Sequence, residues 1–279
     1  LLLLQSGLAA ARWAVLIASL GPPVGYGVVL KLWYIGAFFN QTLPTAVGGD
    51  VMRVWQLVRL NGSLRQAVSS VALDRMVGIA ALALIVAATQ PLMRRLVSDA
   101  MVRSVIVMLV ILAGTLLISL FFMDRLPASW RRLRLCRALA EFSMDARTRL
   151  LQTGKRGRGL ELIAMSLVIH LLTIGAITLM ARGLGAPLRF WQCLVLVPPV
   201  LLAQALPISI AGWGVREGVM VSALALAGVA PTTSLAIALL FGVALLCVGI
   251  PGGPLWLLSS GKRVEGLAWP TAASPGVTE

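Results

Sequence analysis

Residues 105–123 read VIVMLVILAGTLLISLFFM, a stretch without a single charged side chain. Four further runs contain no Asp, Glu, Lys or Arg: Met76 to Met93, Leu162 to Ala181, Phe190 to Val215 and Gly218 to Gly261. About 20 such residues in a helix cross a hydrocarbon core roughly 30 Å thick. The runs therefore predict an all-α, polytopic integral membrane protein. They do not fit outer-membrane strands, in which apolar and polar residues alternate.

The composition excludes a soluble enzyme and a nucleic-acid binder. Of 279 residues, 59% are hydrophobic and 12% are charged, and 24 Lys and Arg against 10 Asp and Glu give a formal charge of +14. So little polar surface cannot cover a soluble particle. Cys136, Cys193 and Cys247 have no metal-ligand spacing, so we expect packing thiols and no cofactor. We expect a multi-pass protein of a cell membrane, the bacterial inner membrane.

Basic residues predict the orientation of the chain. Ten of the 24 basic residues fall between Arg125 and Arg158, so the positive-inside rule places this segment in the cytoplasm. Leu133 and Phe142 are among the apolar residues spaced between the arginines, which indicates amphipathic helices on the membrane surface, bound to anionic lipid. Each membrane-spanning helix moves the chain to the other side of the membrane. Counting the helices back from this segment therefore places the basic residues of 94–103 on the outside, which is an exception to the positive-inside rule.

The expected organisation is one transmembrane domain over residues 1–262, followed by a polar tail over 263–279. We expect the opening LLLLQSGLAAARW to be a truncated membrane helix, because it lacks the basic start and the cleavage site of a signal peptide. The domain divides into a first repeat over about 28–90, the cytoplasmic basic segment over about 124–158 and a second repeat over about 190–258. A homo-oligomer is left open. G-x-x-x-G spacings, which can mark helix contacts, occur at Gly21/Gly25, Gly214/Gly218 and Gly249/Gly253.

Two segments have apolar flanks around a centre that cannot continue a helix. Residues 32–60 and 196–226 align at an offset of 163, and each copy reads Q-x-L-P-x4-G-x3-R. Proline removes a backbone donor and glycine permits unusual backbone angles. We expect an internal duplication whose two copies enter the bilayer from opposite faces as broken, re-entrant helices. This is the inverted-repeat pattern of transporters, in which helix ends point at a polar ligand near the midplane.

The residues after each break suit an anion. Gly48 and Gly49 expose N–H groups at the positive end of a half-helix, with Arg53 one turn further on. Gly212, Gly214 and Arg216 repeat the arrangement. We expect the two arginines to hold an anionic head group alternately, while Asp50, Asp74 or Glu217 supplies balancing charge or a proton site. The alternatives are snorkelling or pairing with Asp50 for Arg53, and a buried pair with Glu217 or Asp74 for Arg216.

Asp74 and Arg75 are adjacent near the start of an apolar helix. Neighbouring positions diverge by about 100° around a helix, so we expect the two side chains to face different partners. The i,i+4 spacing places Ser70 and Gly78 on the face of Asp74. The pair could equally mark the cytoplasmic end of the helix. For His170 we expect a neutral, packed imidazole, with a proton relay as the alternative.

Three motifs carry a resemblance to a known family. FFNQTLPTAVGGDVMRVW, SSVALDRMVGIAALAL and LPISIAGWGVREGVMVSAL begin at residues 38, 69 and 206. In this order they resemble the lysylphosphatidylglycerol synthase transmembrane family, roughly from Ala10 to Trp256. The resemblance implies a flippase-like domain that moves an aminoacylated phospholipid or a polyprenyl-linked glycan between leaflets. In two-domain relatives a soluble domain performs the aminoacylation, and the resemblance here is to the stand-alone form.

The leading hypothesis is a lipid flippase with a central cavity between the two broken segments, acting on a phospholipid or a polyprenyl-linked lipid. The rival is a membrane-embedded transferase acting on a lipid-linked substrate, with Asp50, Asp74 and Glu217 as acid-base groups. A non-catalytic scaffold would leave the intramembrane charges without a purpose. The motifs and the repeat together give the predicted substrate-binding residues: Asn40, Gln41, Pro44, Gly48, Gly49, Asp50, Arg53, Asp74, Arg75, Gln204, Pro207, Gly212, Gly214, Arg216 and Glu217.

Overall fold

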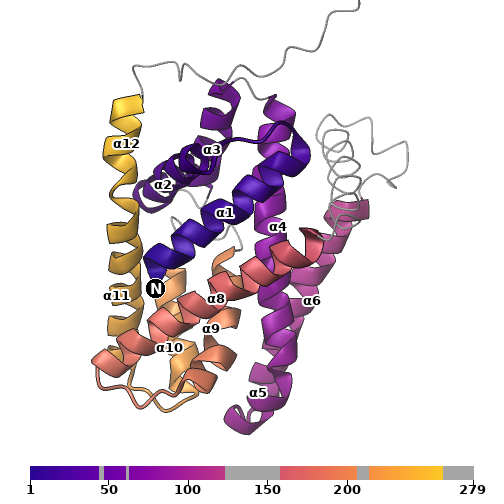
Figure 1. Ribbon diagram of the computed structural model, residues 1–279. Helices are drawn as coiled ribbons and strands as arrows, with labels where there is room; N and C mark the ends of the chain where they lie inside the picture. Colours follow the sequence, from indigo (N-terminus) through magenta and orange to yellow (C-terminus); the bar gives the residue numbers. More distant parts are fainter. Residues whose placement is uncertain (44–46, 61–62, 123–157, 206–213, 260–279) are drawn as a thin grey trace, which may run out of the picture.

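The computed structural model describes residues 1–43, 47–60, 63–122, 158–205 and 214–259, and within these residues it contains helices and no strand (Figure 1). The helices are α1 (Leu2–Leu20), α2 (Tyr26–Thr42), α3 (Gly48–Arg59), α4 (Leu64–Ala88), α5 (Gln90–Leu96), α6 (Ala100–Phe122), α8 (Arg158–Gly183), α9 (Phe190–Ala205), α10 (Val215–Ala225), α11 (Pro231–Gly249) and α12 (Gly252–Ser259).

Four helical stretches are long and apolar enough to cross a membrane. They are α1, α4, α8 and the continuous stretch Pro231–Ser259, which comprises α11 and α12. The lipid-facing character is clearest on α6, where Met101 and Met108 are 77% and 62% exposed. Such exposure is unfavourable in water and ordinary in a bilayer. The prediction of an all-α membrane protein is confirmed.

Local signals explain where several helices begin. Ser63 caps α4, its Oγ accepting a hydrogen bond of 3.2 Å from the backbone N–H of Gln66. Pro231 opens α11, where its missing N–H would have no intrahelical partner. Gly228, at φ +76°, makes the turn before it. The apolar part of the chain after Phe190 is thus divided into α9, α10 and the long stretch Pro231–Ser259.

The first predicted helix break is present between α2 and α3, whereas the second, Pro207 to Gly212, lies outside the described residues. α2 ends at Thr42 and α3 begins at Gly48, and α9 ends at Ala205 and α10 begins at Val215. α3 packs against α2 and α4, and α10 packs against α9 and α11. In Figure 1, α2 and α3 lie toward one end of the molecule, and α9 and α10 lie toward the other. The pseudo-two-fold relation between the two copies stays a prediction.

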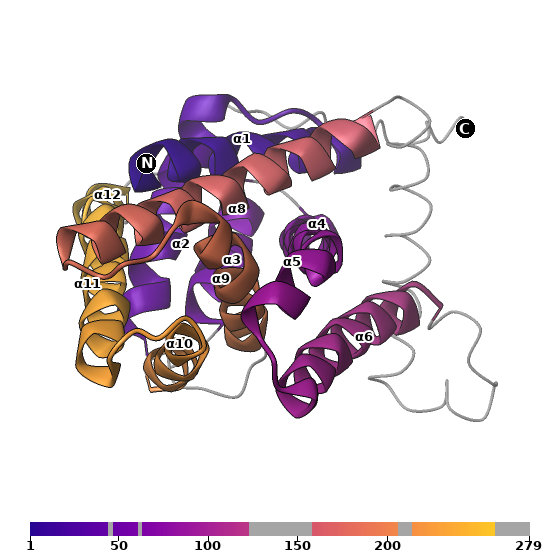
Figure 2. The same cartoon turned by 90° about the horizontal axis from the view of Figure 1, so that it is seen from below.

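Among the described residues there are three buried apolar clusters, and the two largest hold most of the helices together. One joins α1 to α4 through residues that include Trp13, Val29, Leu57 and Val71. The other joins α4 to α8, α9, α10 and α11. α4 belongs to both clusters and runs the length of the molecule, with α1 and α8 side by side across it (Figures 1 and 2). α4 therefore connects the first three helices with α8 and α9, and α11 and α12 make a second connection by packing on α2.

Of the three glycine spacings, Gly249/Gly253 marks a helix contact, whereas no atom lies within 4 Å of a Cβ built on Gly214 or Gly218. A Cβ built on Gly249 would lie 3.3 Å from the backbone oxygen of Ala37, and one on Gly253 would lie 3.2 Å from the Phe38 ring. α11 and α12 thus pack closely on α2.

The predicted cytoplasmic segment lies outside the described residues except for Arg158, the first residue of α8. Its orientation stays a prediction.

Candidate functional site

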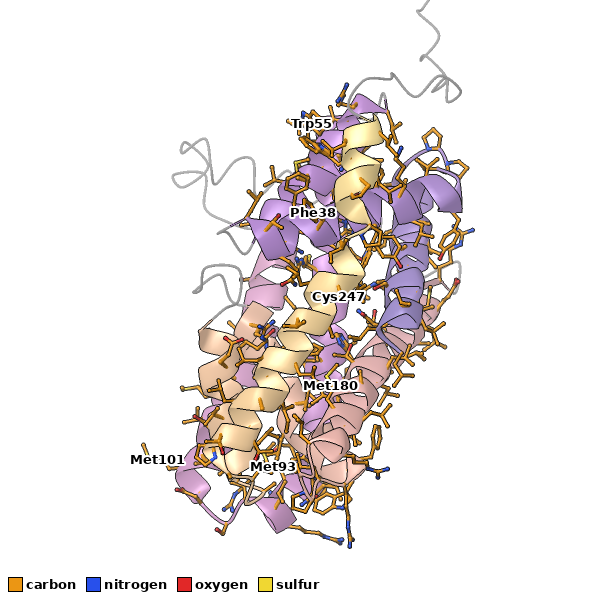
Figure 3. The ribbon with its side chains drawn as sticks, turned by 90° about the vertical axis from the view of Figure 1, so that its left-hand side faces the viewer. Phe38, Trp55, Met93, Met101, Met180 and Cys247 are labelled. Atoms are coloured by element: carbon orange, nitrogen blue, oxygen red, sulfur yellow. The ribbon has the colours of Figure 1, made fainter. Side chains whose placement is uncertain are left out.

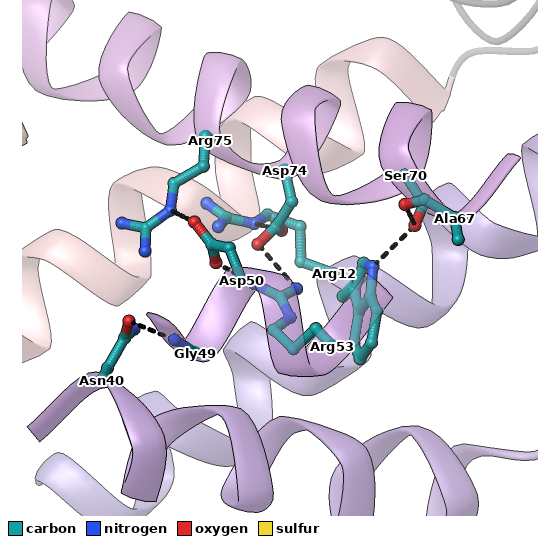
Figure 4. Close-up of polar contacts among 10 residues, drawn as sticks. Arg12, Asn40, Gly49, Asp50, Arg53, Ala67, Ser70, Asp74 and Arg75 are labelled. Carbon is teal, nitrogen blue, oxygen red and sulfur yellow. Dashed lines mark hydrogen bonds and ion pairs between the residues drawn. The ribbon is translucent and has the colours of Figure 1, made fainter. Parts of the chain in front are cut away.

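Five charged side chains from three helices meet inside the first apolar cluster (Figure 4). They are Arg12 of α1, Asp50 and Arg53 of α3, and Asp74 and Arg75 of α4. We call them the charged cluster. Asp74 and Arg12 are each ten residues past the first residue of their helix, about 15 Å along it. The charged cluster therefore lies near the middle of the apolar helices.

Both oxygens of the Asp74 carboxylate are occupied. Nε of Arg12 donates to Oδ1 at 2.9 Å, and Nη2 of Arg53 donates to Oδ2 at 3.0 Å. Arg75 faces a different partner, with its Nε donating to Oδ2 of Asp50 at 2.8 Å. Nη1 of Arg53 lies 3.5 Å from Oδ1 of Asp50. The prediction that Asp74 and Arg75 diverge is confirmed, and the pairing of Arg53 with Asp50 proves to be one part of a larger network.

The charged cluster has more positive than negative charge. Three arginines and two aspartates give a formal charge of +1, and helix α3 directs its positive N-terminal end toward the same region. Arg12, Asp50, Arg53 and Asp74 are each buried, whereas the Arg75 side chain is 48% exposed. Among the described residues, the terminal amino groups of Arg75 have no hydrogen-bond or ion-pair partner. The terminal amino groups of Arg75 are therefore the part of the charged cluster that can bind a ligand.

Neutral side chains complete the contacts of the two buried arginines. Nη1 of Arg12 donates to Oγ of Ser166 on α8 at 2.7 Å. The Arg53 guanidinium lies 4.0 Å from the centroid of the Trp13 ring, a favourable cation–π contact. Trp13 is itself oriented by its Nε1, which donates to Oγ of Ser70 at 3.2 Å. Ser70 therefore lies on the face of Asp74, as the i,i+4 spacing predicts.

Gly78 also lies on that face. A Cβ built on Gly78 would lie 3.5 Å from Nη1 of Arg12. Nε2 of His170, on α8, lies 3.0 Å from the Gly78 carbonyl oxygen, which accepts its hydrogen bond. His170 is half-buried at this helix contact. The packed imidazole that the sequence favours is therefore what the structure contains.

The first break is closed by Asn40. Its Oδ1 accepts a hydrogen bond of 3.0 Å from the backbone N–H of Gly49, so α2 caps the start of α3. Glycine is needed here because a Cβ on Gly49 would collide with the backbone oxygen of Gly36. The sequence predicted that this N–H is open to an anion. In the structure it is bound to Asn40 instead. A buried donor without an acceptor is costly, and the chain supplies its own.

At the start of α10, after the second break, a side chain of the protein likewise accepts from a backbone N–H. Gly214, at φ +86°, donates its backbone N–H to Oε2 of Glu217 at 2.5 Å. Nη2 of Arg216 donates to Oε1 of Glu217 at 2.6 Å. The Arg216 guanidinium packs against Gly242 of α11, where a Cβ would lie 2.8 Å from its Cζ. The pair with Glu217, one of the alternatives for Arg216, is thus present.

The predicted residues fall into four groups. The charged cluster and its neighbour contain Asn40, Gly49, Asp50, Arg53, Asp74 and Arg75. The start of α10 contains Gly214, Arg216 and Glu217. Gln41, Gln204 and Gly48 lie at helix ends beside the breaks. Pro44, Pro207 and Gly212 lie outside the described residues.

Arg12 is the residue that sequence reasoning missed. It is 7% exposed and connects Asp74 to Ser166, so it joins α1, α4 and α8. The signal was available, since Arg12 is the only charged residue in the first 30. A charge within a membrane helix is costly and therefore points to a buried partner.

These features define an all-α membrane protein with a net-positive charged cluster halfway along its apolar helices. The model of the lysylphosphatidylglycerol synthase transmembrane region matches residues 1–253, and the chain belongs to this family. The match confirms the resemblance that the three sequence motifs indicate. No curated protein and no solved structure matches the chain.

Proposed function

We propose that this protein moves a lipid with an anionic head group, a phospholipid or a polyprenyl-linked lipid, between the leaflets of the bacterial inner membrane. The observation that carries the proposal is the charged cluster, with three arginines against two aspartates near mid-helix. Membership of a family of membrane domains, which is proposed to act as a flippase, supports the same function.

The charge imbalance supports a ligand rather than a purely structural role. Each charged residue at the centre of a membrane helix costs about 3 kcal/mol on insertion scales. Equal numbers of the two signs would hold α1, α3 and α4 together with no residual charge. Here two carboxylates are shared among three arginines, so one positive charge is left over. A phosphate would balance it.

Arg75 is the residue best suited to receive that phosphate. Its Nε is bound to Asp50, which fixes the plane of the guanidinium, and its side chain is 48% exposed. Two terminal amino groups in a fixed plane match two phosphate oxygens, which is the geometry of strong bidentate contacts. Arg75 would therefore bind the head group without any rearrangement of the buried pairs.

An unsatisfied amide also lies at the helix end beside each break. Oε1 of Gln41 and Nε2 of Gln204 are buried, and neither atom has a hydrogen-bond partner within the described part of the chain. The two residues occupy the same position of the two sequence copies. Because a buried polar atom normally finds a partner, these amides support a polar ligand beside the breaks. Head-group hydroxyls and amines are suitable partners.

Movement between leaflets would use the ion pairs as exchangeable contacts. Arg53 is held by Asp50 and Asp74, and Arg216 is held by Glu217. In the proposed cycle each arginine exchanges its carboxylate for the head-group phosphate as the two broken helices move. The carboxylates then balance charge when no lipid is bound. The intramembrane site is thus kept close to neutral throughout, which lowers the barrier to crossing.

The proposal is tested with the purified chain in vesicles that contain fluorescent phosphatidylglycerol, where a membrane-impermeant quencher reports the fraction that reaches the outer leaflet. We expect exchange to be faster than in protein-free vesicles, and faster for phosphatidylglycerol than for zwitterionic phosphatidylcholine. Polyprenyl phosphate is tested in parallel, and mass spectrometry verifies that the lipid is chemically unchanged. Exchange at the protein-free rate for all the lipids would refute the proposal, and a modified lipid would favour the transferase.

A further inference from the structure

We propose a second lipid site, separate from the charged cluster, in a groove between α5 and α6 that binds one anionic phospholipid. The groove has a volume of about 350 Å³ and is open on one side. This is the size of an ordinary small-molecule site. Its polar end is lined by Gln90, Arg94, Arg103 and Ser104. Two arginines at one end of a membrane-embedded groove are suited to a phosphate.

The rest of the groove is apolar. Val107 and Met108 line it from α6, at i+3 and i+4 spacings from Arg103 and Ser104, and Ile111 lines it one turn further on. One face of α6 therefore presents polar residues at its start and apolar residues further along, over about 10 Å. Free phosphate would leave this apolar surface uncovered, whereas an acyl chain would cover it. The shape and chemistry of the groove thus match a phospholipid.

The arginines of the groove lack carboxylate partners. Within the described residues, neither Arg94 nor Arg103 forms an ion pair, and Arg103 donates only to the backbone oxygens of Val97 and Ser98. The nearby acid Asp99 uses its Oδ1 to accept the backbone N–H of Met101. The groove therefore has an excess of positive charge that a phosphodiester would balance.

The position of the groove fits a lipid of one leaflet. Figure 3 shows Met93 of α5 and Met101 of α6 at the end of the molecule opposite to Trp55 of α3. Arg94 and Arg103 then lie at the level of head groups, beside α6 residues that face lipid. A bound anionic lipid also gives a reason for basic residues on the side where the positive-inside rule does not expect them.

The site is tested by photo-crosslinking in nanodiscs, using phosphatidylglycerol with a photoactivatable acyl chain and mapping the labelled peptides. We expect label on residues 100–111. Arg94→Gln should reduce it about tenfold, because a charge-assisted hydrogen bond to phosphate is lost. The matched control is Arg95→Gln, which removes a neighbouring exposed arginine that does not line the groove. Met108→Trp should block labelling, and Met101→Trp, outside the groove lining, should not.

Three results would overturn this assignment. Equal labelling by photoactivatable phosphatidylcholine would mean that the groove contains only bulk lipid. Unchanged labelling in a folded Arg94→Gln variant would mean that the head group binds elsewhere. Competition by inorganic phosphate, with none by unlabelled phosphatidylglycerol, would mean that the site binds a free anion. Because Arg94 and Met108 are remote from the charged cluster, these results are independent of the leaflet-exchange experiment.

Discussion

Replacing Asp74 with asparagine removes the carboxylate that two buried arginines share. Arg12 and Arg53 donate to its two oxygens at 2.9 and 3.0 Å, and all three side chains are less than a tenth exposed. The substitution conserves shape, turns an acceptor into an NH2 group and raises the formal charge of the charged cluster from +1 to +2. Breaking a buried ion pair in this way costs about 3–5 kcal/mol. For a chain of this size the loss corresponds to a fall in melting temperature on the order of 10 °C.

The melting temperature is measured in detergent from tryptophan fluorescence, since the chain has 8 tryptophans and Trp13 stacks on Arg53. The control is Asp99→Asn, at an exposed acid of the α5–α6 turn, which should change the stability by less than about 0.5 kcal/mol. The double variant Arg12→Gln/Asp74→Asn restores the charge to +1 and should recover part of the loss. If Asp74→Asn melts as close to the wild type as Asp99→Asn does, the reasoning about the charged cluster is wrong.

Two further substitutions test the helix breaks by the same melting measurement. Gly242→Ala places a Cβ against the Arg216 guanidinium and should lower the free energy of unfolding by about 1–3 kcal/mol. The control Gly218→Ala, with no atom within 4 Å of the new Cβ, should be neutral or slightly stabilising. Equal melting temperatures of the two variants would contradict the buried position of Arg216. Asn40→Ala leaves the N–H of Gly49 without its acceptor and should cost about 0.5–2 kcal/mol, and Asn40→Asp, which keeps the acceptor, should restore the stability. Failure of that rescue would show that Asn40 acts by packing.

Sequence reasoning predicted the helical membrane fold and the break between α2 and α3, because uncharged runs, proline and glycine act through local rules. It also predicted that Asp74 and Arg75 face apart, since that follows from helix geometry alone. The partners of Asp74 could not be predicted. They depend on α1 and α3 both reaching α4 at the same level, which is a property of the packed helices. For the same reason the sequence predicted open N–H groups at Gly49 and Gly214, whereas Asn40 and Glu217 accept from these two groups.

Leaflet exchange of fluorescent phosphatidylglycerol by Arg75→Gln is the most direct test of whether the open guanidinium of Arg75 binds the lipid head group. We expect loss of exchange in Arg75→Gln, slower exchange in Arg75→Lys, which keeps the charge and loses the planar fork, and wild-type exchange in Arg95→Gln. Melting curves verify that each variant is folded. Exchange by Arg75→Gln at the wild-type rate would show that Arg75 does not bind the head group.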